Sequence, residues 1–409
     1  MYNLNPLFNN FKPTFSGVEI DMLSLGDADS ILVTEWSGNY VFRVLIDGGT
    51  ARDTKAVREF LRSRGVTSLY AVVCTHMHND HARGLIELVK DKTLSITFGW
   101  MHDMRKHAST DALRRASTGN SSQADGVKEA LETTRELASA FASRGITPQE
   151  PFAGQTIALL PGLTVLGPTP QFYKKALEES IGEPVPAIGS FIAALAAAKP
   201  SSPYAPVIPP GTGLLSDMLA RPALPAIPLS FLGGPLTSPA KSPLGLDLSA
   251  SFFGALSNSS VAEKPKTQPF NNTSAILGME YNSSKFLFTA DAGSEALDAV
   301  HSSWKEVYWM QVPHHGSDGN LSQRNIERFR PRHAFVSAKG DSSHPDRAIV
   351  SGLIKVGGQV FSTHMNGHLW HRIGSVPARL GYNDAVPLKG NADPLPFAEW
   401  FYPPVPGRL

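Results

Sequence analysis

The sequence predicts an α/β protein in which two β-sheets pack face to face between outer helices, an αββα sandwich. Two strand-rich stretches, within residues 18–75 and from residue 271 onward, flank a long proline-rich segment. In the first half, stretches with apolar residues three or four positions apart follow the strands and predict helices. Two strand-rich halves of this kind are typical of the layered αββα architecture.

The first half begins as an antiparallel sheet. Val18, Ile20 and Met22 alternate with acidic residues, which predicts a strand with one buried face. Residues 30–36 and 40–46 continue the strand pattern. The sequence Ser37-Gly38-Asn39 predicts the hairpin turn between them.

A helix and a buried strand come next. Asp53 stands where a helix N-cap belongs and Gly65 where a glycine ends a helix, so we expect a helix between them. An apolar strand at 68–75 follows. It contains the only cysteine, Cys74, which we expect in the core because it lies in an apolar run. Residues 102–145 are evenly charged and predict a solvated layer of helices.

The composition changes after a predicted strand at 163–166. Residues 184–269 hold nearly half of the 32 prolines, and proline removes the backbone donors that a sheet interior needs. We therefore divide the chain into a first half at 1–170, an insertion at 171–269 rich in proline, alanine and serine, and a second half at 270–409. The insertion is expected to be a lid over the site or a surface for a protein partner. The alternative is a long, poorly ordered loop.

Apolar runs predict the strands of the second half. These strands are expected at 274–279, 285–290, 306–312, 333–338 and 359–362. Several of these runs are followed closely by residues that bind metals.

The overall composition excludes some classes of protein. The formal net charge is +1, so the chain lacks the single-sign surface of a protein that binds nucleic acid by bulk electrostatics. One cysteine leaves no internal disulfide and no cysteine-based zinc module. No targeting signal and no apolar run long enough to cross a bilayer is evident, which predicts a cytoplasmic protein without a membrane partner. The sequence does not predict the oligomeric state.

The strongest signal for chemistry is the run His76-Met77-His78-Asn79-Asp80-His81. It directly follows an apolar strand and leads into a helix. Imidazole nitrogens and carboxylate oxygens are ligands for zinc, manganese and iron. We expect His76 and His78 to hold one metal ion, and Asp80 and His81 to hold a second.

Further candidate ligands follow strands in the second half. A two-ion site needs a bridging carboxylate, and the apolar run 286–290 ends on Asp291. The next strand leads to His314 and His315. Adjacent side chains usually point apart, so we expect one of these histidines to bind metal and the other to face the substrate. His344 follows the next strand and is either a site residue or a loop histidine.

These motifs together resemble the metallo-β-lactamase superfamily, and within it the branch that contains the C-terminal domain of the competence protein ComEC. The similarity covers residues 17–100 and 270–370 and leaves out the insertion. The matching segments, in the family's order, are Leu25–Leu32, Ile46–Gly49, His76–His81, Asn271–Ser274, Phe288–Asp291, His314–Ser317 and His344-Pro345.

The resemblance implies two divalent ions, Zn²⁺ or Mn²⁺, as cofactors. The metal ligands are expected to be His76, His78, Asp80, His81, Asp291 and one of the pair His314 and His315. We place His315 in this ligand set, and His314, with Asp80 and His344, among the catalytic residues. Asp27, Asp29 and Asp47 are interpreted as turn and supporting residues, and Asp47 is a candidate for orienting the histidines.

Departures from the family pattern concern the substrate. Arg83 stands where the branch usually has glycine, and we expect it to bind an anionic group. The pair Asn271-Asn272 stands where many relatives have a third histidine for the first ion. That ion is therefore expected to bind weakly, and Asn272 is expected to contact the substrate. DNA uptake is not implied, because the sequence lacks the membrane segments of ComEC.

The predicted function is a metal-dependent hydrolase that uses two ions to activate water. Paired ions neutralise charge on the attacking and leaving oxygens of a phosphodiester. A phosphodiesterase or nuclease is therefore the leading interpretation, and nucleic acid is a candidate substrate. The alternatives are an ester, thioester or lactam hydrolase of the same fold, and a non-catalytic sensor or regulatory subunit. Arg83 and an aspartate ligand at 291 instead of cysteine count against a lactam substrate.

Overall fold

The computed structural model describes residues 14–109, 122–157, 162–181, 261–263, 266–341, 343–379 and 384–390. All of them belong to one of the two units into which the chain divides, the unit of Met1–Val185 and Leu256–Leu409. The insertion predicted at 171–269 lies for the most part outside the described residues. Its role as a lid or partner surface, and the domain division itself, stay predictions.

Two six-stranded sheets pack face to face in the described part of the chain. The first contains, in spatial order, β12 (Leu369–Ser375), β1 (Phe15–Met22), β2 (Ile31–Gly38), β3 (Tyr40–Ile46), β4 (Ser68–Val73) and β5 (Ser95–Trp100). The second contains β11 (Gln359–Ser362), β10 (His333–Val336), β9 (Trp309–Gln311), β8 (Ser284–Phe288), β7 (Ile276–Tyr281) and β6 (Thr164–Gly167). Strands β3 to β5 are parallel, and so are β8 to β11.

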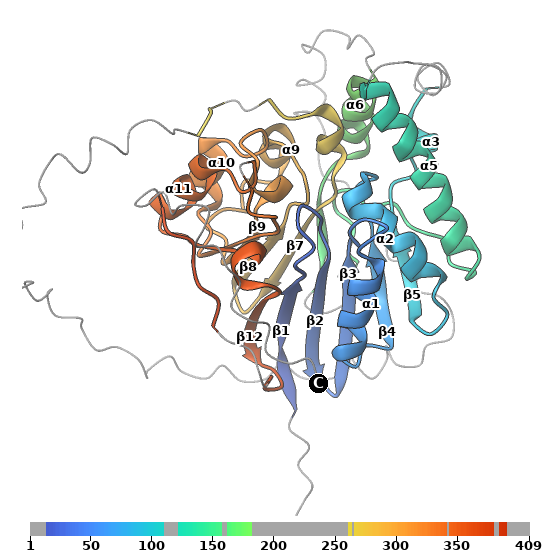
Figure 1. The fold of residues 1–409 in the computed structure, drawn as a ribbon, viewed down its shortest axis with the longest axis horizontal. Helices are drawn as coiled ribbons and strands as arrows, with labels where there is room; N and C mark the ends of the chain where they lie inside the picture. Colours follow the sequence, from blue (N-terminus) through green and yellow to red (C-terminus); the bar gives the residue numbers. More distant parts are fainter. Residues whose placement is uncertain are drawn as a thin grey trace, which may run out of the picture. The chain divides into compact units, whose positions relative to one another are not determined.

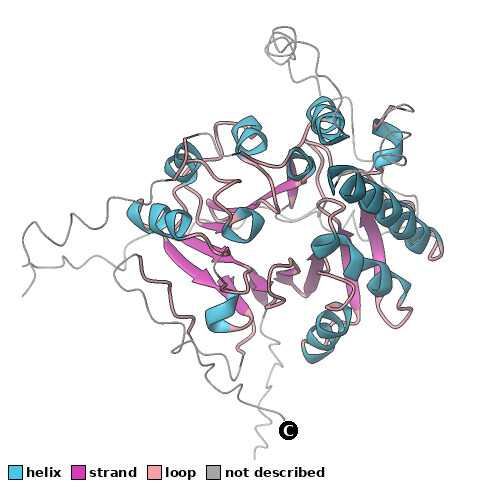
Figure 2. Cartoon of the chain, turned by 45° about the horizontal axis from the view of Figure 1, so that its top comes forward, coloured by secondary structure: helices cyan, strands magenta, loops and turns pink. Residues whose placement is uncertain are grey.

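Helices cover the outer face of each sheet, on opposite sides of the strands (Figure 1). On the first sheet lie α1 (Thr54–Ser63), α2 (Asn79–Lys90), α5 (Ser122–Ala142) and α6 (Pro170–Ile181). On the second lie α9 (Ser294–Ala299), α10 (Gln323–Phe329) and α11 (Arg347–Lys355). Short helices are α3 (Met104–His107), α12 (Thr363–Asn366), and the 3₁₀ turns η2 (Pro269–Thr273) and η3 (Pro313–Gly316). Figure 2 shows the strands between these helices, so the predicted αββα sandwich is confirmed.

The alternating pattern correctly predicts the strands that carry the core. Ile20 on β1 and Val33 on β2 face Phe286 and Trp309 across the space between the sheets. Cys74 is fully buried, as expected. The pattern does not predict β5 and β12, because both are edge strands of the first sheet and their exposed positions weaken the alternation.

The start of α1 differs in one detail from the sequence prediction. Asp53 occupies the N-cap position, but its side chain does not cap the helix. Its carboxylate instead accepts hydrogen bonds from the backbone N and the Oγ1 of Thr50, at 2.9 and 2.6 Å. Gly65 follows the helix with φ +62°, as a helix-ending glycine does.

Among the described residues, no helix is both long and apolar enough to cross a membrane.

His371 on β12 lies in an aromatic cluster between the two sheets. The centroid of its ring is 4.9 Å from that of His333, 5.3 Å from that of Tyr308 and 6.0 Å from that of Phe335. Burial, together with the neighbouring His333, lowers the pKa of His371 from 6.5 to about 3. The folded protein therefore holds this imidazole in its neutral form.

We expect His371 to make the protein less stable in mild acid. Between the two pKa values the unfolded chain binds a proton at His371 and the folded chain does not, so stability falls as the pH decreases below 6.5. The loss from this one group between pH 7 and pH 5 should be about 2 kcal/mol. Urea unfolding at pH 7 and pH 5 measures the loss of unfolding free energy, and this loss should be about 2 kcal/mol smaller in His371→Phe than in wild type. The exposed His301→Phe variant is the control, and an equal loss in His371→Phe and wild type would contradict the prediction.

Candidate metal centre

The candidate ligands gather at one edge of the sandwich, where parallel strands end. Strand β4 ends at Val73 and leads into the histidine motif, and Asp80 lies in the first turn of α2. Strand β8 ends just before Asp291, and β9 ends just before His314. Because parallel strands present their carboxyl ends at the same edge, these distant segments meet.

One group of four side chains surrounds a common point. It consists of Asp80, His81, Asp291 and His315, and one ligand atom from each lies within 4.8 Å of all the others. Nε2 of His81 is 3.2 Å from Oδ1 of Asp291. Nε2 of His315 is 3.4 Å from Oδ2 of Asp80. Donors from both sheets therefore meet here.

A second group of three side chains shares Asp291 with the first. It consists of His76, His78 and Asp291. Nε2 of His76 lies 3.0 Å from Nδ1 of His78 and 3.7 Å from Oδ2 of Asp291. The two oxygens of Asp291 thus face different groups of histidines, as the carboxylate of a bridging ligand does.

Some buried polar atoms of the site lack a hydrogen-bond partner among the described residues, and such atoms suit the binding of cations. Nε2 of His81 and both carboxylate oxygens of Asp291 are buried and accept or donate no hydrogen bond among the described residues. Burying an ionised carboxylate without a partner is costly unless a positive charge compensates it. Nitrogen and oxygen donors at this density are those that divalent metal ions bind, so the arrangement fits such ions.

Charged neighbours shift the pKa values of the side chains in the group of four. Burial opposes ionisation of Asp291, but His81 and His314 hold the pKa of its carboxyl well below the usual range. Burial lowers the pKa of His81, yet the carboxylates around it outweigh burial and raise that pKa well above the usual value. In the same way Asp80 and other carboxylates raise the pKa of His315 to about 9. A metal ion must therefore displace protons from this group when it binds.

Supporting residues orient the ligand histidines. Oδ2 of Asp47 lies 2.8 Å from Nδ1 of His81, and the same carboxylate accepts from the backbone N of Thr75 at 2.8 Å. Nδ1 of His315 is 3.0 Å from the carbonyl oxygen of Ser337, which can only accept. Both histidines therefore hold a proton on Nδ1 and turn Nε2 toward the site.

The structure separates the two adjacent histidines. His314 and His315 both have left-handed backbone conformations, with φ of 49° and 55°. His315 joins the group of four. His314 lies beside it, with Nε2 at 3.7 Å from Oδ2 of Asp291 and Nδ1 at 2.9 Å from Oδ1 of Asn320.

His344 lies at the open side of the site with His314. Its ring centroid is 5.7 Å from that of His314 and 5.8 Å from that of His315. Its Nδ1 is 3.6 Å from Oδ2 of Asp27. The side chains of His314 and His344 are 25% and 21% exposed, so solvent reaches both.

The two residues expected to bind substrate have other contacts. Arg83 donates to Glu136 on α5 at 2.9 Å and to Oδ1 of Asn79 at 3.2 Å. Asn272 is buried, and its Oδ1 accepts from the backbone N of Gly293 at 3.2 Å. Asn272 thus contacts the loop that follows Asp291. The substrate-binding roles of both residues stay predictions.

Several supporting residues lie outside the motifs that the sequence singles out. Gln311, Asn320 and Ser337 are buried polar residues around the candidate ligands. Gln311 could have been found, since it is a polar residue inside the apolar run Trp309–Val312. Asn320 and Ser337 carry no such signal, because loops and strand ends are commonly polar.

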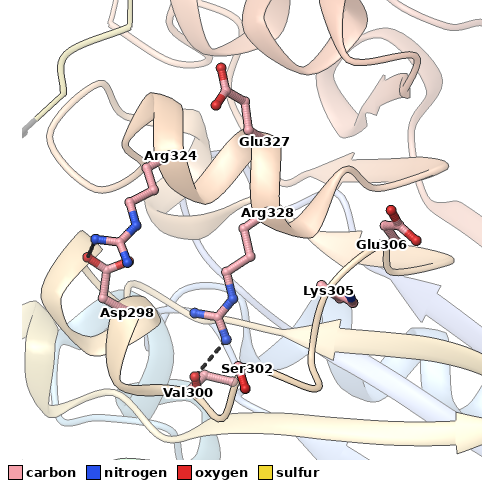
Figure 3. A pocket seen from close by; sticks show the side chains of 8 residues that line it. All are labelled: Asp298, Val300, Ser302, Lys305, Glu306, Arg324, Glu327 and Arg328. Carbon is pink, nitrogen blue, oxygen red and sulfur yellow. Dashed lines mark hydrogen bonds and ion pairs between the residues drawn. The ribbon is translucent and has the colours of Figure 1, made fainter.

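A separate surface cleft of about 440 Å³ lies between α9 and α10 (Figure 3). Arg328 donates to the carbonyl oxygen of Val300 there, at 2.6 Å, and Arg324 faces Asp298. Three cationic and three acidic side chains line the cleft, so it favours neither an anion nor a cation. None of the candidate ligands lines it.

Parts of the sequence are similar to known proteins. A family model described as metallo-beta-lactamase superfamily matches residues 26–103. ComE operon protein 3 of Bacillus subtilis is 27% identical over 114 residues, which cover 27% of this chain and 15% of that protein. The crystal structure of MEM-A1, a subclass B3 metallo-beta-lactamase from a soil metagenome library, aligns with 18% identity and a TM-score of 0.21 over 37% of this chain and 50% of that one. A similarity this low does not bear on the fold.

The fold and the histidine and aspartate cluster define an αββα protein with a site suited to divalent metal ions. Residues 26–103 of the chain match the metallo-β-lactamase superfamily, and part of the sequence is similar to a ComE protein. Because the chain matches only a small part of the length of ComE operon protein 3, the activity of that whole protein does not transfer.

The shared position of Asp291 gives a test of the metal centre. Asp291→Ala removes a donor from both groups, whereas His78→Ala removes one from a single group. After loading with Zn²⁺, we expect about two ions per chain in wild type, about one in His78→Ala and fewer in Asp291→Ala. Elemental analysis measures the stoichiometry. Asp298→Ala, in the separate surface cleft, is the matched control, and equal losses in the two site variants would show that Asp291 serves one ion only.

Proposed function

We propose that the protein is a hydrolase that uses two divalent ions, Zn²⁺ or Mn²⁺, to cleave phosphodiester bonds. The observation that carries the proposal is the buried Asp291 carboxylate, whose two oxygens face two separate groups of donors. His76 and His78 are proposed to hold the first ion with Asp291. Asp80, His81 and His315 are proposed to hold the second with the same carboxylate. When bound, such a pair of ions lowers the pKa of water and neutralises charge on the substrate.

The chain's own residues supply positioning and proton transfer. His314 is held at Nδ1 by Asn320, which leaves Nε2 directed toward the site beside Asp291. His344 lies next to it, with Asp27 near its Nδ1. We propose that these two histidines contact the phosphoryl and leaving-group oxygens, where a histidine can donate a hydrogen bond or a proton.

The positive charge of Arg83, which is close in sequence to two candidate ligands, supports an anionic substrate. Arg83 lies one helical turn after Asp80 on α2, and it is paired with Glu136. This pair is partly exposed, and an exposed pair contributes only about 0–1 kcal/mol, so a phosphate can displace Glu136. Arginine commonly binds phosphate oxygens in a bidentate manner.

The pairing of Arg83 with Glu136 also favours one alternative function, the hydrolysis of an uncharged substrate. While Glu136 balances the charge of Arg83, an uncharged ester, thioester or lactam meets no excess of positive charge from Arg83. A hydrolase of such substrates is therefore the second candidate function. The two candidates differ in what Arg83 and Glu136 should do to turnover.

Variants of this pair distinguish the two functions. For bis(4-nitrophenyl) phosphate with Zn²⁺ or Mn²⁺, Arg83→Ala should lower kcat/KM by about tenfold, or about 1.4 kcal/mol, because it removes a cation that the charged transition state needs. Glu136→Gln should lower KM, because it releases Arg83. The exposed Arg62→Ala variant is the control. Failure to hydrolyse the diester, with good turnover of a lactam or thioester that neither variant changes, would favour the alternative.

A further inference from the structure

We infer that Asp29 and Gln311 form a buried cross-link between the two sheets that positions Asp291 and His315 before any metal ion binds. The inference rests on the proposed metal centre, and it concerns two residues that are not candidate ligands. Both are 1% exposed, and both lie at the edge where the ligands gather.

Asp29 joins the first sheet to the second through both of its oxygens. It lies in the loop between β1 and β2. Its Oδ2 accepts from Nε2 of Gln311 at 2.7 Å, and its Oδ1 accepts from the hydroxyl of Ser337. Gln311 ends β9 and Ser337 follows β10, both in the second sheet.

Gln311 carries the link on to the bridging carboxylate. Its Oε1 accepts from the backbone N of Ala290 at 3.1 Å. Ala290 has a φ of +47°, in the left-handed region that residues with a side chain rarely adopt, and it directly precedes Asp291. The amide of Gln311 therefore holds the turn that directs Asp291 into the site.

Ser337 carries the link to a second ligand. Its hydroxyl donates to Asp29, and its carbonyl oxygen lies 3.0 Å from Nδ1 of His315. Asp29 also lies 3.8 Å from Nδ1 of His81. One carboxylate of the first sheet thus supports ligands that come from both sheets.

The amide at position 311 has to donate and accept at the same time. It donates to Asp29 and accepts from Ala290, and a side chain such as methionine of similar length does neither. Partners that orient metal ligands typically contribute 10–100-fold to metal affinity. We therefore expect Gln311→Met to weaken Zn²⁺ binding by about tenfold or more.

An exchange of the two side chains tests the link itself. In the double variant Asp29→Asn/Gln311→Glu, the amide at position 29 donates to the carboxylate at position 311. That carboxylate still accepts from Ala290, and the net charge is unchanged. The double variant should bind Zn²⁺ within about threefold of wild type. Gln359→Met, at an exposed position on β11, is the matched control.

Competition with a chelator measures the Zn²⁺ affinity of each protein. Thermal unfolding of the metal-free proteins shows whether each variant is folded. Weak binding by folded Gln311→Met with recovery in the double variant supports the inference. Wild-type affinity in Gln311→Met, or binding in the double variant as weak as in Gln311→Met, overturns it. If Gln311→Met does not fold, the affinity of the double variant decides alone. A wild-type protein that binds no Zn²⁺ overturns the proposed function instead.

Discussion

The site is built around the carboxylate of Asp291, which is fully buried and accepts no hydrogen bond from the part of the chain that the structure describes. Such a group needs a positive charge beside it. The two oxygens of Asp291 face two groups of histidines. His76, His78 and His81 follow β4 in the first sheet, and His315 follows β9 in the second. The sandwich provides this position because parallel strands of both sheets end at one edge. The helices on the outer faces and the apolar layer between the sheets keep that edge in place.

The positive charge is supplied by protonated histidines when no metal ion is bound. Neighbouring carboxylates raise the pKa values of His81 and His315, although burial acts in the opposite direction. Metal ions and protons therefore compete for the same nitrogens. The left-handed residues Ala290, His314 and His315 would be unfavourable in an open loop, and buried hydrogen bonds around them hold these conformations.

The metal ligands alone do not select a substrate, because the same fold hosts several chemistries. We propose that selection depends on His314 and His344, which are accessible at the open side of the site, and on Arg83, which is paired with Glu136. On this proposal, the strength of the pair between Arg83 and Glu136 sets how much positive charge a substrate meets. A weak, partly exposed pair is compatible with an anionic substrate that replaces the glutamate.

The sequence predicts the αββα class and most strands, because alternating apolar residues report burial directly. It also predicts the candidate ligands, because the histidines and the aspartate of residues 76–81 are spaced as metal ligands are. Tertiary structure alone decided three points. It fixed how His315 joins the candidate ligand group while His314 lies beside it, since the direction of adjacent side chains depends on backbone conformations that contacts with Ala290 and Ser337 hold. It paired Arg83 with Glu136, which lies 53 residues away in the chain. It joined Asp29 to Gln311, because a hydrogen bond between residues 282 positions apart exists only after the two sheets have packed together.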